Sequence, residues 1–374
     1  MSKIVVIAGF AESLIRFRGD LLVAMRANGH EVAAIAPEDD DSVRKRLAEK
    51  GVEYHVVPMA RAGLNPFADL RYLLQLSQCL RKIKPDVVLA YTIKPVVYGL
   101  PAARLAGIKR RYALITGLGY AFTDAEASFS RNLIKRVASG LYKFGLSFAT
   151  GLFFQNPDDQ KLFKDRGLSS ENLPTLVVNG SGVDTDSFPV APLPEQPSFL
   201  FVGRVLRDKG VVEYAEAARM LKPIYPHATF HLVGPMDSNP SGISEEMVSS
   251  WEKEGLIQYH GAVSDVKPHI AACSVFVLPS YREGTPRSVL EAMSCARAIV
   301  TTDAPGCRET VIDGENGYLV KPRDSADLAK AMGRLAGSRE LRERMGRTSR
   351  ELAEQKYDVH RVNSIMISAM ELRG

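Results

Sequence analysis

The sequence lacks several features that would assign it to a common class of protein. None of its apolar runs is long enough to span a bilayer as a helix, and its short apolar amino end predicts a first strand rather than a signal peptide. Its four cysteines show no CxxC or metal-ligand spacing, and its seven histidines form no metal-like cluster. We therefore expect a cytoplasmic protein with free thiols, and without a membrane span. The cysteines are Cys79, Cys273, Cys295 and Cys307.

Two nucleotide-binding signatures are also missing. The first predicted strand–helix turn, at 9–13, lacks a full GxGxxG, which argues against an NAD-dependent dehydrogenase. No DxD pair follows a short apolar strand as a metal-bridged diphosphate requires, because Asp184 and Asp186 have that spacing but lie in a predicted linker. We therefore expect cationic side chains and helix ends, with no metal ion, to carry the charge of a diphosphate.

Positive charge is concentrated in one part of the chain. The formal net charge is +5, whereas residues 100–150 alone hold eight basic residues against two acidic ones. Such a segment implies an anionic partner: lipid headgroups, a pyrophosphate-linked acceptor or nucleic acid. Within it, apolar and basic positions at 131–150 have helical spacing, so we expect the apolar face to pack on the core and consider the basic face for contact with a membrane.

Short apolar strands alternate with helical segments along almost the whole chain, which predicts parallel sheets covered by helices on both faces. The pattern is interrupted at 179–197, where turn residues and four prolines predict a linker. We expect an α/β protein with two Rossmann-like domains, 1–185 and 186–356, and a helix at 357–374 that returns to the first. The predicted strands are 4–8, 31–36, 54–57, 86–90, 111–115, 151–154, 175–178, 198–202, 228–233, 257–259, 275–279 and 298–302. The predicted helices include 14–26, 65–82, 131–150, 158–166 and 359–372.

The most informative segment contains two carboxylates, Glu283 and Glu291, with seven residues between them. It follows an apolar strand and should open a helix, and open α/β sheets bind ligands at that edge. Unpaired N–H groups at a helix start favour a phosphate, while carboxylates accept hydrogen bonds from sugar hydroxyls. The combination indicates a nucleotide-sugar site. The structural alternative is a surface ion pair between Arg287 and Glu291, with Glu283 favouring the helix amino end.

The second domain offers further candidates for the same site. Its first strand ends at Gly203, and Arg204 and Lys209 then precede a helix. Two cations at the carboxyl end of a strand suit a diphosphate leaving group. Loops at 234–241 and 260–263, the latter ending at Val263, follow other strands and have backbone groups of the kind that hold a nucleobase.

Candidates in the first domain are Arg16 and Arg18. Arg16 and Arg18 follow the first strand–helix turn and are placed to reach an acceptor phosphate. The alternative for these two arginines is a solvated first helical turn.

Together these residues resemble the retaining family 4 glycosyltransferases, over nearly the whole chain. The resemblance rests on the two spaced carboxylates, on Gly203-Arg204 with Lys209-Gly210, and on the segments 182–184 and 313–320. Segments 61–66, 92–95, 116–120 and 237–241 are similar to a bacterial subgroup that builds capsule, O-antigen and lipid-linked oligosaccharides. The resemblance implies a GT-B fold and metal-independent transfer without a cofactor.

The same resemblance assigns roles to the candidates. Arg204 and Lys209 would bind the donor diphosphate, Glu291 the ribose, and Glu283 the hydroxyls of the donor sugar. The backbone of Gly284, Thr285 and Pro286 would lie beside that sugar, and Glu283, Arg204 and Lys209 would carry catalysis. The acceptor-side residues would be Arg16, Arg18 and Lys94. One departure concerns the segment after strand 111–115, where several relatives have a histidine and this chain has Thr116-Gly117. We therefore assign no general base.

The sequence thus predicts a retaining hexosyltransferase, peripheral on the inner face of the cell membrane. It would move a sugar, with N-acetylhexosamine the favoured candidate, from a UDP donor to a saccharide linked to a polyprenyl diphosphate, with no nucleic-acid partner. The alternatives are a nucleotide-sugar epimerase of the same fold and a non-catalytic protein that binds anionic lipid or nucleic acid.

Overall fold

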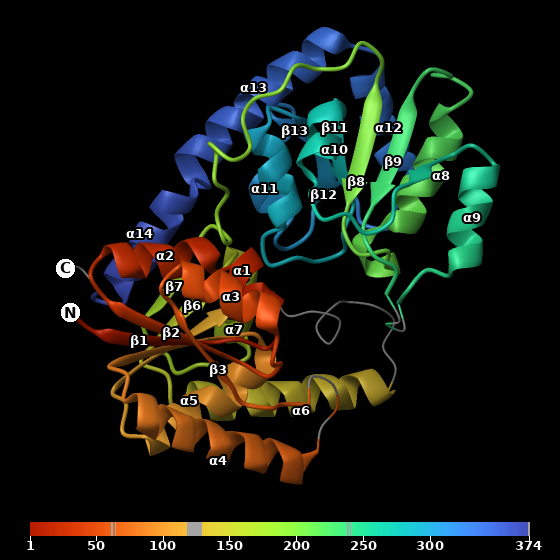
Figure 1. Ribbon diagram of the computed structural model, residues 1–374. Coiled ribbons are helices and arrows are strands. Elements are labelled where there is room, and N and C mark those ends of the chain that lie inside the picture. The colour runs from red at the N-terminus through yellow and green to blue at the C-terminus, as the bar shows by residue number, and fades with distance from the viewer. Residues whose placement is uncertain (61–62, 64, 118–128, 238, 240, 373–374) are drawn as a thin grey trace. The chain divides into compact units, whose positions relative to one another are not determined.

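The structure is a computed structural model that describes residues 1–60, 63, 65–117, 129–237, 239 and 241–372. These residues form two compact units (Figure 1). The first comprises Met1–Ser181 and His360–Gly374, and the second comprises Gly182–Val359. Each unit is built on a parallel sheet with helices packed against it, so the α/β class predicted from the strand–helix alternation is confirmed.

The first unit contains a sheet of seven strands in the order β3-β2-β1-β4-β5-β6-β7. The chain runs outward from β1 to β3 and then returns to the other side of β1 for β4, so the switch point lies between β1 and β4. Ligands of open α/β sheets bind at such a switch point. The strands are β1 (Lys3–Ile7), β2 (Glu31–Ala36), β3 (Glu53–Val56), β4 (Val87–Tyr91), β5 (Arg110–Ile115), β6 (Gly151–Phe154) and β7 (Thr175–Val177).

Two helical layers cover this sheet, because each face contributes apolar side chains to its own core. One layer holds α4 (Pro66–Ile83), a π-helical turn (Pro95–Gly99), α5 (Leu100–Leu105), α6 (Phe129–Leu146) and α7 (Pro157–Asp165). The other holds α1 (Glu12–Arg16), α2 (Gly19–Ala27), α3 (Asp41–Glu49) and α14 (Val359–Ala369) (Figure 1). None of the helices described in the chain is both long and apolar enough to cross a bilayer.

The prediction of a single helix at 14–26 is wrong. The first helix ends at Arg16, the backbone leaves helical geometry at Arg18, and a second helix starts at Gly19. At this break the Arg18 side chain turns inward, where it is buried, donates to the Ser181 hydroxyl at 3.2 Å and lies over the Tyr91 ring. The apolar periodicity continues across the break, so the pattern alone concealed it.

The second unit contains six strands in the order β10-β9-β8-β11-β12-β13, all paired in parallel. Here the switch point lies between β8 and β11. The strands are β8 (Ser198–Val202), β9 (Thr229–Val233), β10 (Gln258–Tyr259), β11 (Val275–Leu278), β12 (Ala298–Thr302) and β13 (Gly317–Val320). Strand β13 was not predicted, since it is short, begins with glycine and lies at the sheet edge.

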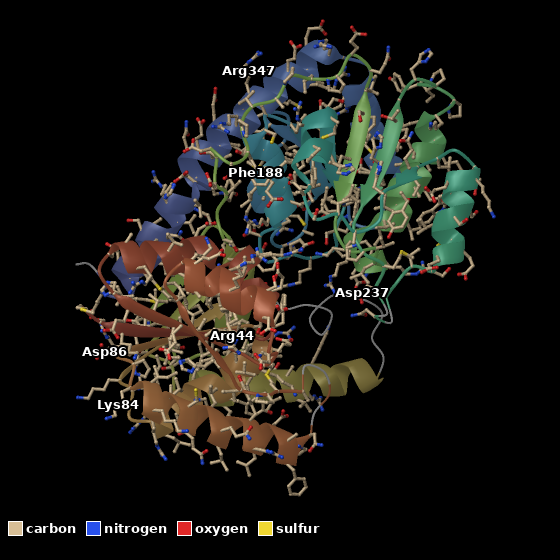
Figure 2. All side chains as sticks on the ribbon, in the orientation of Figure 1. Arg44, Lys84, Asp86, Phe188, Asp237 and Arg347 are labelled. Atoms are coloured by element: carbon tan, nitrogen blue, oxygen red, sulfur yellow. The ribbon has the colours of Figure 1, made fainter. Side chains whose placement is uncertain are left out.

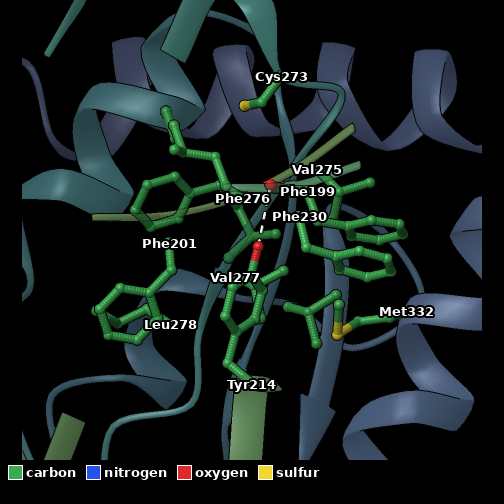
Figure 3. Packing of buried hydrophobic residues seen from close by; sticks show 14 of the residues in the cluster. Phe199, Phe201, Tyr214, Phe230, Cys273, Val275, Phe276, Val277, Leu278 and Met332 are labelled. Atoms are coloured by element: carbon green, nitrogen blue, oxygen red, sulfur yellow. Dashed lines mark hydrogen bonds between the residues drawn. The ribbon is translucent and has the colours of Figure 1, made fainter. Parts of the chain in front are cut away.

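Aromatic side chains fill the centre of this unit (Figure 3). The rings of Phe199 and Phe230 stack with centroids 5.1 Å apart, and the Tyr214 hydroxyl donates to the Phe199 carbonyl at 3.0 Å. This packing fixes the first helix of the unit against β8 and β9. The helices are α8 (Val211–Leu221), α9 (Glu245–Lys253), α10 (Lys267–Ala272), α11 (Arg287–Ser294), α12 (Ser325–Ala336) and α13 (Arg339–Lys356).

The segment predicted as a linker is packed on the second unit from Gly182 onward. Val183 pairs with the backbone of Tyr357 and Val359, and Phe188 is buried in the core. The buried Arg297 guanidinium donates to the carbonyls of residues 191 and 192. Prolines and aspartates prevent regular structure here, but they do not prevent burial.

Candidate functional site

The candidate site of the second unit lies at the switch point of its sheet. Strand β8 ends at Val202, and Gly203 and Arg204 follow directly. Its neighbour β11 ends at Leu278, and the loop 279–286 then leads into α11. The two chain segments that sequence analysis selected therefore leave the sheet at adjacent positions.

Hydrogen bonds hold these two loops together. The Tyr281 N–H donates to the Asp208 carbonyl at 2.9 Å, and the Ser280 hydroxyl donates to the same oxygen at 3.1 Å. The result is an ion pair between the Lys209 ammonium and the Glu283 carboxylate, both largely buried. The structure thus brings together one predicted cation and one predicted carboxylate.

Close backbone approaches require glycine on both sides of this ion pair. Gly210 has φ +77°, and a Cβ there would lie 2.2 Å from the Pro279 carbonyl oxygen. Gly306 has φ +81°, and a Cβ there would lie 2.2 Å from the Glu283 carbonyl oxygen. The Glu283 N–H also donates to the Pro305 carbonyl at 2.9 Å. The loop after β12 therefore fixes the backbone that presents Glu283.

Helix α11 starts beside Glu283 without a side-chain cap. Its N-cap residue is Pro286, whose side chain accepts no hydrogen bond, whereas α9, α12 and α13 are capped by Ser244, Asp324 and Ser338. Thr285 and Gly284 precede it in the same loop. Pro286 itself therefore adds no side-chain acceptor at the amino end of α11, whose partial positive charge favours an anion.

Glu291 lies one turn into α11, where it is buried. Its Oε1 accepts from the Arg287 Nε at 2.9 Å, so the ion pair considered as the structural alternative does form. The pair is partly buried rather than a solvated surface pair. Holding Glu291 in place does not compete with a ribose contact, because a carboxylate has several acceptor positions.

Arg204 is exposed and pairs with Asp237, whose Oδ2 lies 2.7 Å from an Arg204 terminal nitrogen. Asp237 lies in the loop after β9 (Figure 2). Burial opposes ionisation of Asp237, but a hydrogen bond from the Asn239 N–H and the Arg204 guanidinium together hold its pKa below the usual value. Val263, the remaining donor-site candidate, is half-buried beyond β10 and packs against the core.

The acceptor candidates of the first unit occupy different surroundings. Arg16 is exposed and pairs with Glu12 at 3.1 Å, while Arg18 is buried against Tyr91. Lys94 is buried, with its Nζ 2.9 Å from Asp69 Oδ1. Arg18 and Lys94 both lie near the switch point between β1 and β4, whereas Arg16 points to solvent.

The sequence analysis did not identify the ion-pair partners of the candidate residues Lys94 and Arg204. Neither Asp69 nor Asp237 has a spacing that predicts its ion pair, because each meets its cation only through the fold. It also missed Glu213 of α8, which is buried and accepts from the Tyr281 hydroxyl at 2.6 Å. Asp184 caps a local turn through the N–H groups of Asp186 and Ser187.

No group of three or more His, Cys, Asp or Glu side chains is arranged to hold a metal ion in the described residues. Parts of three segments used in the resemblance lie outside those residues, namely 61–62 and 64, 118–120, and 238 and 240.

Comparison with protein-family models assigns both halves of the chain. Residues 15–180 match the model described as a glycosyl transferase 4-like domain, and residues 196–338 match the model described as glycosyl transferases group 1.

Two curated bacterial proteins show similarity over most of this chain. The N,N'-diacetylbacillosaminyl-diphospho-undecaprenol alpha-1,3-N-acetylgalactosaminyltransferase of Campylobacter jejuni is 32% identical, over 92% of this chain and 92% of its own. The UDP-Gal:alpha-D-GlcNAc-diphosphoundecaprenol alpha-1,3-galactosyltransferase of Escherichia coli is 27% identical, over 81% and 77%.

Among solved structures, HepE of Anabaena in complex with UDP and glucose matches with a TM-score of 0.78 and 19% identity. The match covers 99% of this chain and 100% of that one. At that identity the likeness concerns the fold, which has two Rossmann-like domains as predicted.

Proposed function

Since this chain belongs to the group 1 glycosyltransferases of the GT-B fold, we propose that it transfers an N-acetylhexosamine from a UDP-sugar to a saccharide carried on a polyprenyl diphosphate. The names of the two curated relatives support this choice, because both specify a sugar acceptor linked to undecaprenol through a diphosphate. One of them transfers N-acetylgalactosamine, and the other takes galactose from UDP.

The observation that carries the proposal is the Lys209–Glu283 ion pair beside the start of α11, where the N-cap residue is Pro286. The Lys209 ammonium has three N–H donors, so it can hold Glu283 and a phosphate oxygen together. The amino end of α11 supplies further donors for the same diphosphate. Charge that develops on the leaving group thus meets fixed positive groups without reorganisation of the site.

We propose donor contacts for the other residues around the Lys209–Glu283 ion pair as well. Arg204 carries several N–H donors and can contact the diphosphate while one of them remains on Asp237. Glu291 accepts from the ribose hydroxyls, and Glu283 accepts from hydroxyls of the donor sugar beside the Gly284–Pro286 backbone. Val263 borders the nucleobase.

The chemical step breaks the bond between the sugar C1 and the diphosphate oxygen and forms a bond from C1 to an acceptor hydroxyl oxygen. In the retaining course that we propose, both events occur on one face of the sugar. The departing diphosphate oxygen takes the proton of the acceptor hydroxyl, so no protein base is needed for the balance. We propose that this step is independent of a metal ion, because Lys209, Arg204 and α11 provide the positive charge.

The acceptor belongs on the first unit in this proposal, near the switch point between β1 and β4. Arg18 and Lys94 are the cations there that favour its diphosphate, and Arg16 reaches it from the solvent side. An acceptor anchored in lipid requires the protein to work at a membrane surface, so we propose peripheral association with the inner face of the cell membrane.

The decisive experiment offers the purified protein a panel of UDP- and GDP-sugars with a short-chain polyprenyl-diphosphate-sugar, in EDTA. Products are analysed by mass spectrometry. We expect the acceptor to gain the mass of one N-acetylhexosamine from one UDP-sugar. Isomerised donor without any acceptor would instead support an epimerase, and a protein that binds no nucleotide would contradict the proposal.

A further inference from the structure

Helix α4 exposes a row of large apolar side chains on its outer face. Phe67 is 87% exposed, Leu70 is 55% and Leu74 is 50%. Their spacing of three and then four residues places them on one side of the helix, while Tyr72, Leu76 and other residues of α4 face the core. Single exposed apolar residues are ordinary on a protein surface, but a row of them marks an interaction site. We refer to Phe67, Leu70 and Leu74 as the α4 stripe.

The neighbouring helices of the same layer add to this surface. Helices α4, α5 and α6 lie on the same side of the first sheet (Figure 1), and Arg81 of α4 donates to the Leu105 carbonyl of α5 at 3.0 Å. Leu105 is itself exposed, as are Val137 and Phe144 of α6. Exposed apolar side chains therefore occur on all three helices of this layer and not on α4 alone.

The exposed charges of these three helices have one sign. Asp69 is the one acidic residue in their sequences, and it is buried in the ion pair with Lys94. The exposed charged residues that the structure describes on these helices are Arg71, Arg81, Lys82, Arg104, Arg136 and Lys143. An apolar stripe bordered by basic residues, on helices without an exposed acidic residue, matches the interface of an anionic bilayer, where acyl chains lie beneath negative headgroups.

We propose that the outer face of α4, together with α5 and α6, docks on an anionic lipid bilayer, with the α4 stripe entering the headgroup–acyl boundary. This inference rests on the proposed function for the presence of a membrane at the site of action. A second copy of the chain fits the surface poorly, because two such faces would bring like charges together. Nucleic acid would use the basic residues but leave the α4 stripe in water.

The test is co-sedimentation of the full-length protein with vesicles of phosphatidylglycerol and phosphatidylcholine, compared with vesicles of phosphatidylcholine alone. We expect binding to the anionic vesicles that weakens as salt is raised, since the basic residues act through screened charges. Phe67→Ser/Leu70→Ser/Leu74→Ser should weaken binding at least tenfold, because it removes the apolar contact. Arg71→Glu/Lys82→Glu should weaken it similarly and reduce its dependence on salt.

Matched controls come from the second unit. Met220→Ser/Ile224→Ser removes two other exposed apolar side chains, and Arg344→Glu/Arg347→Glu makes the same change of charge on α13, where Arg347 is labelled in Figure 2. Both controls should bind vesicles like the unsubstituted protein. Circular dichroism checks that all variants fold, and light scattering records their oligomeric state.

Equal vesicle binding by the α4 stripe variant and the Met220→Ser/Ile224→Ser control would overturn the inference. A loss of self-association in the α4 stripe variant without a loss of vesicle binding would identify a second copy as the occupant, and would also overturn it. The transfer assay with the short-chain acceptor separates the two proposals. A protein that binds anionic vesicles through the α4 stripe but transfers no sugar would leave the docking surface standing while the proposed function fails.

Discussion

Lys209 and Glu283 form an ion pair although 74 positions separate them along the chain. They meet because β8 and β11 are neighbours at the switch point of the second sheet, and because Asp208 accepts hydrogen bonds from the Glu283 loop. Each residue therefore helps to hold the other in place and, in the proposed function, each also contacts the donor. Substitutions can separate these two contributions.

Lys209→Ala should lower the transfer rate by about 10²- to 10³-fold, the usual effect of removing one donor to developing charge. It should also lower the stability of the second unit by about 1–3 kcal/mol, because Glu283 loses a partner in a largely buried place. The double variant Lys209→Ala/Glu283→Gln should regain much of the stability but none of the activity. Turnover and thermal unfolding of both variants check this, with the exposed Lys253→Ala as control. Wild-type turnover in folded Lys209→Ala would defeat the assigned role.

Gly306→Ala should impair the site without altering any side chain in it. A Cβ at Gly306 cannot be accommodated 2.2 Å from the Glu283 carbonyl oxygen, so the loop that presents Glu283 must move. We expect at least a tenfold loss of kcat/KM, by analogy with small displacements of positioned groups. Gly255→Ala is the matched control, since Gly255 has a similar φ of +70° but no atom within 4 Å of its Cβ position. Equal values of kcat/KM in the two variants would contradict the role of the close contact between position 306 and the Glu283 carbonyl oxygen.

Glu213 and Tyr281 should act as a structural pair behind the site. Oε1 of the buried Glu213 accepts from Tyr281, and its Oε2 is buried without a hydrogen-bond partner in the part of the chain that the structure describes. Burial first, and then this hydrogen bond, raise the pKa of Tyr281 above its usual value. Tyr281→Phe should therefore destabilise the unit by about 1–3 kcal/mol, because the buried carboxylate loses its donor.

The same pair offers a test by non-additivity. The double variant Glu213→Gln/Tyr281→Phe should lower the free energy of unfolding by less than the sum of the decreases in the two single variants, as expected for residues in contact. Urea unfolding of the unsubstituted protein, the two single variants and the double variant gives the coupling free energy between the two residues. Tyr318→Phe in β13 serves as the control tyrosine substitution. Additive losses would mean that the hydrogen bond contributes nothing.

His231 should make the second unit less stable in mild acid. Burial first, and then the neighbouring His260, His269 and Lys222, lower the pKa of His231 from 6.5 to about 4. Between pH 6.5 and pH 4 the unfolded chain therefore binds a proton that the folded chain does not, so stability falls as the pH falls through this window.

Since His231 is only half-buried, we expect an effect of about 1 kcal/mol between pH 7 and pH 5 rather than the full equivalent of the shift. His231→Gln should lose less stability than the unsubstituted protein over that range. Thermal unfolding at several pH values measures this, and His227→Gln, at an exposed position, serves as control. Parallel pH profiles for the two variants would contradict the expectation.

Much of the fold was predictable because it follows from local patterns. The strands at 31–36, 151–154, 198–202 and 298–302 were predicted with the bounds that the structure has, since buried parallel strands are short apolar runs between turns. The break of the first helix at Arg18 was not predictable, because its cause is burial of that side chain against Tyr91 and Ser181.

The residues of the candidate site also divide into those that the sequence predicted and those that it did not. Strand ends and helix starts are local features, so Arg204, Lys209, Glu283 and Glu291 could be selected from the sequence. Their partners were not predictable from spacing. Asp237 reaches Arg204 from another loop, and Glu283 depends on Gly306 for the position of its backbone.

The sequence by itself determined the alternation of strands and helices and the placement of charged residues at strand ends, because both depend on neighbours along the chain. Only the tertiary structure decided which charges meet and which apolar residues remain in water. The order of strands brings Lys209 to Glu283 and buries Asp69 with Lys94. The same packing turns Tyr72 and Leu76 of α4 inward and leaves Phe67 and Leu70 outside. Such choices depend on residues far apart in the chain, and no local pattern contains them.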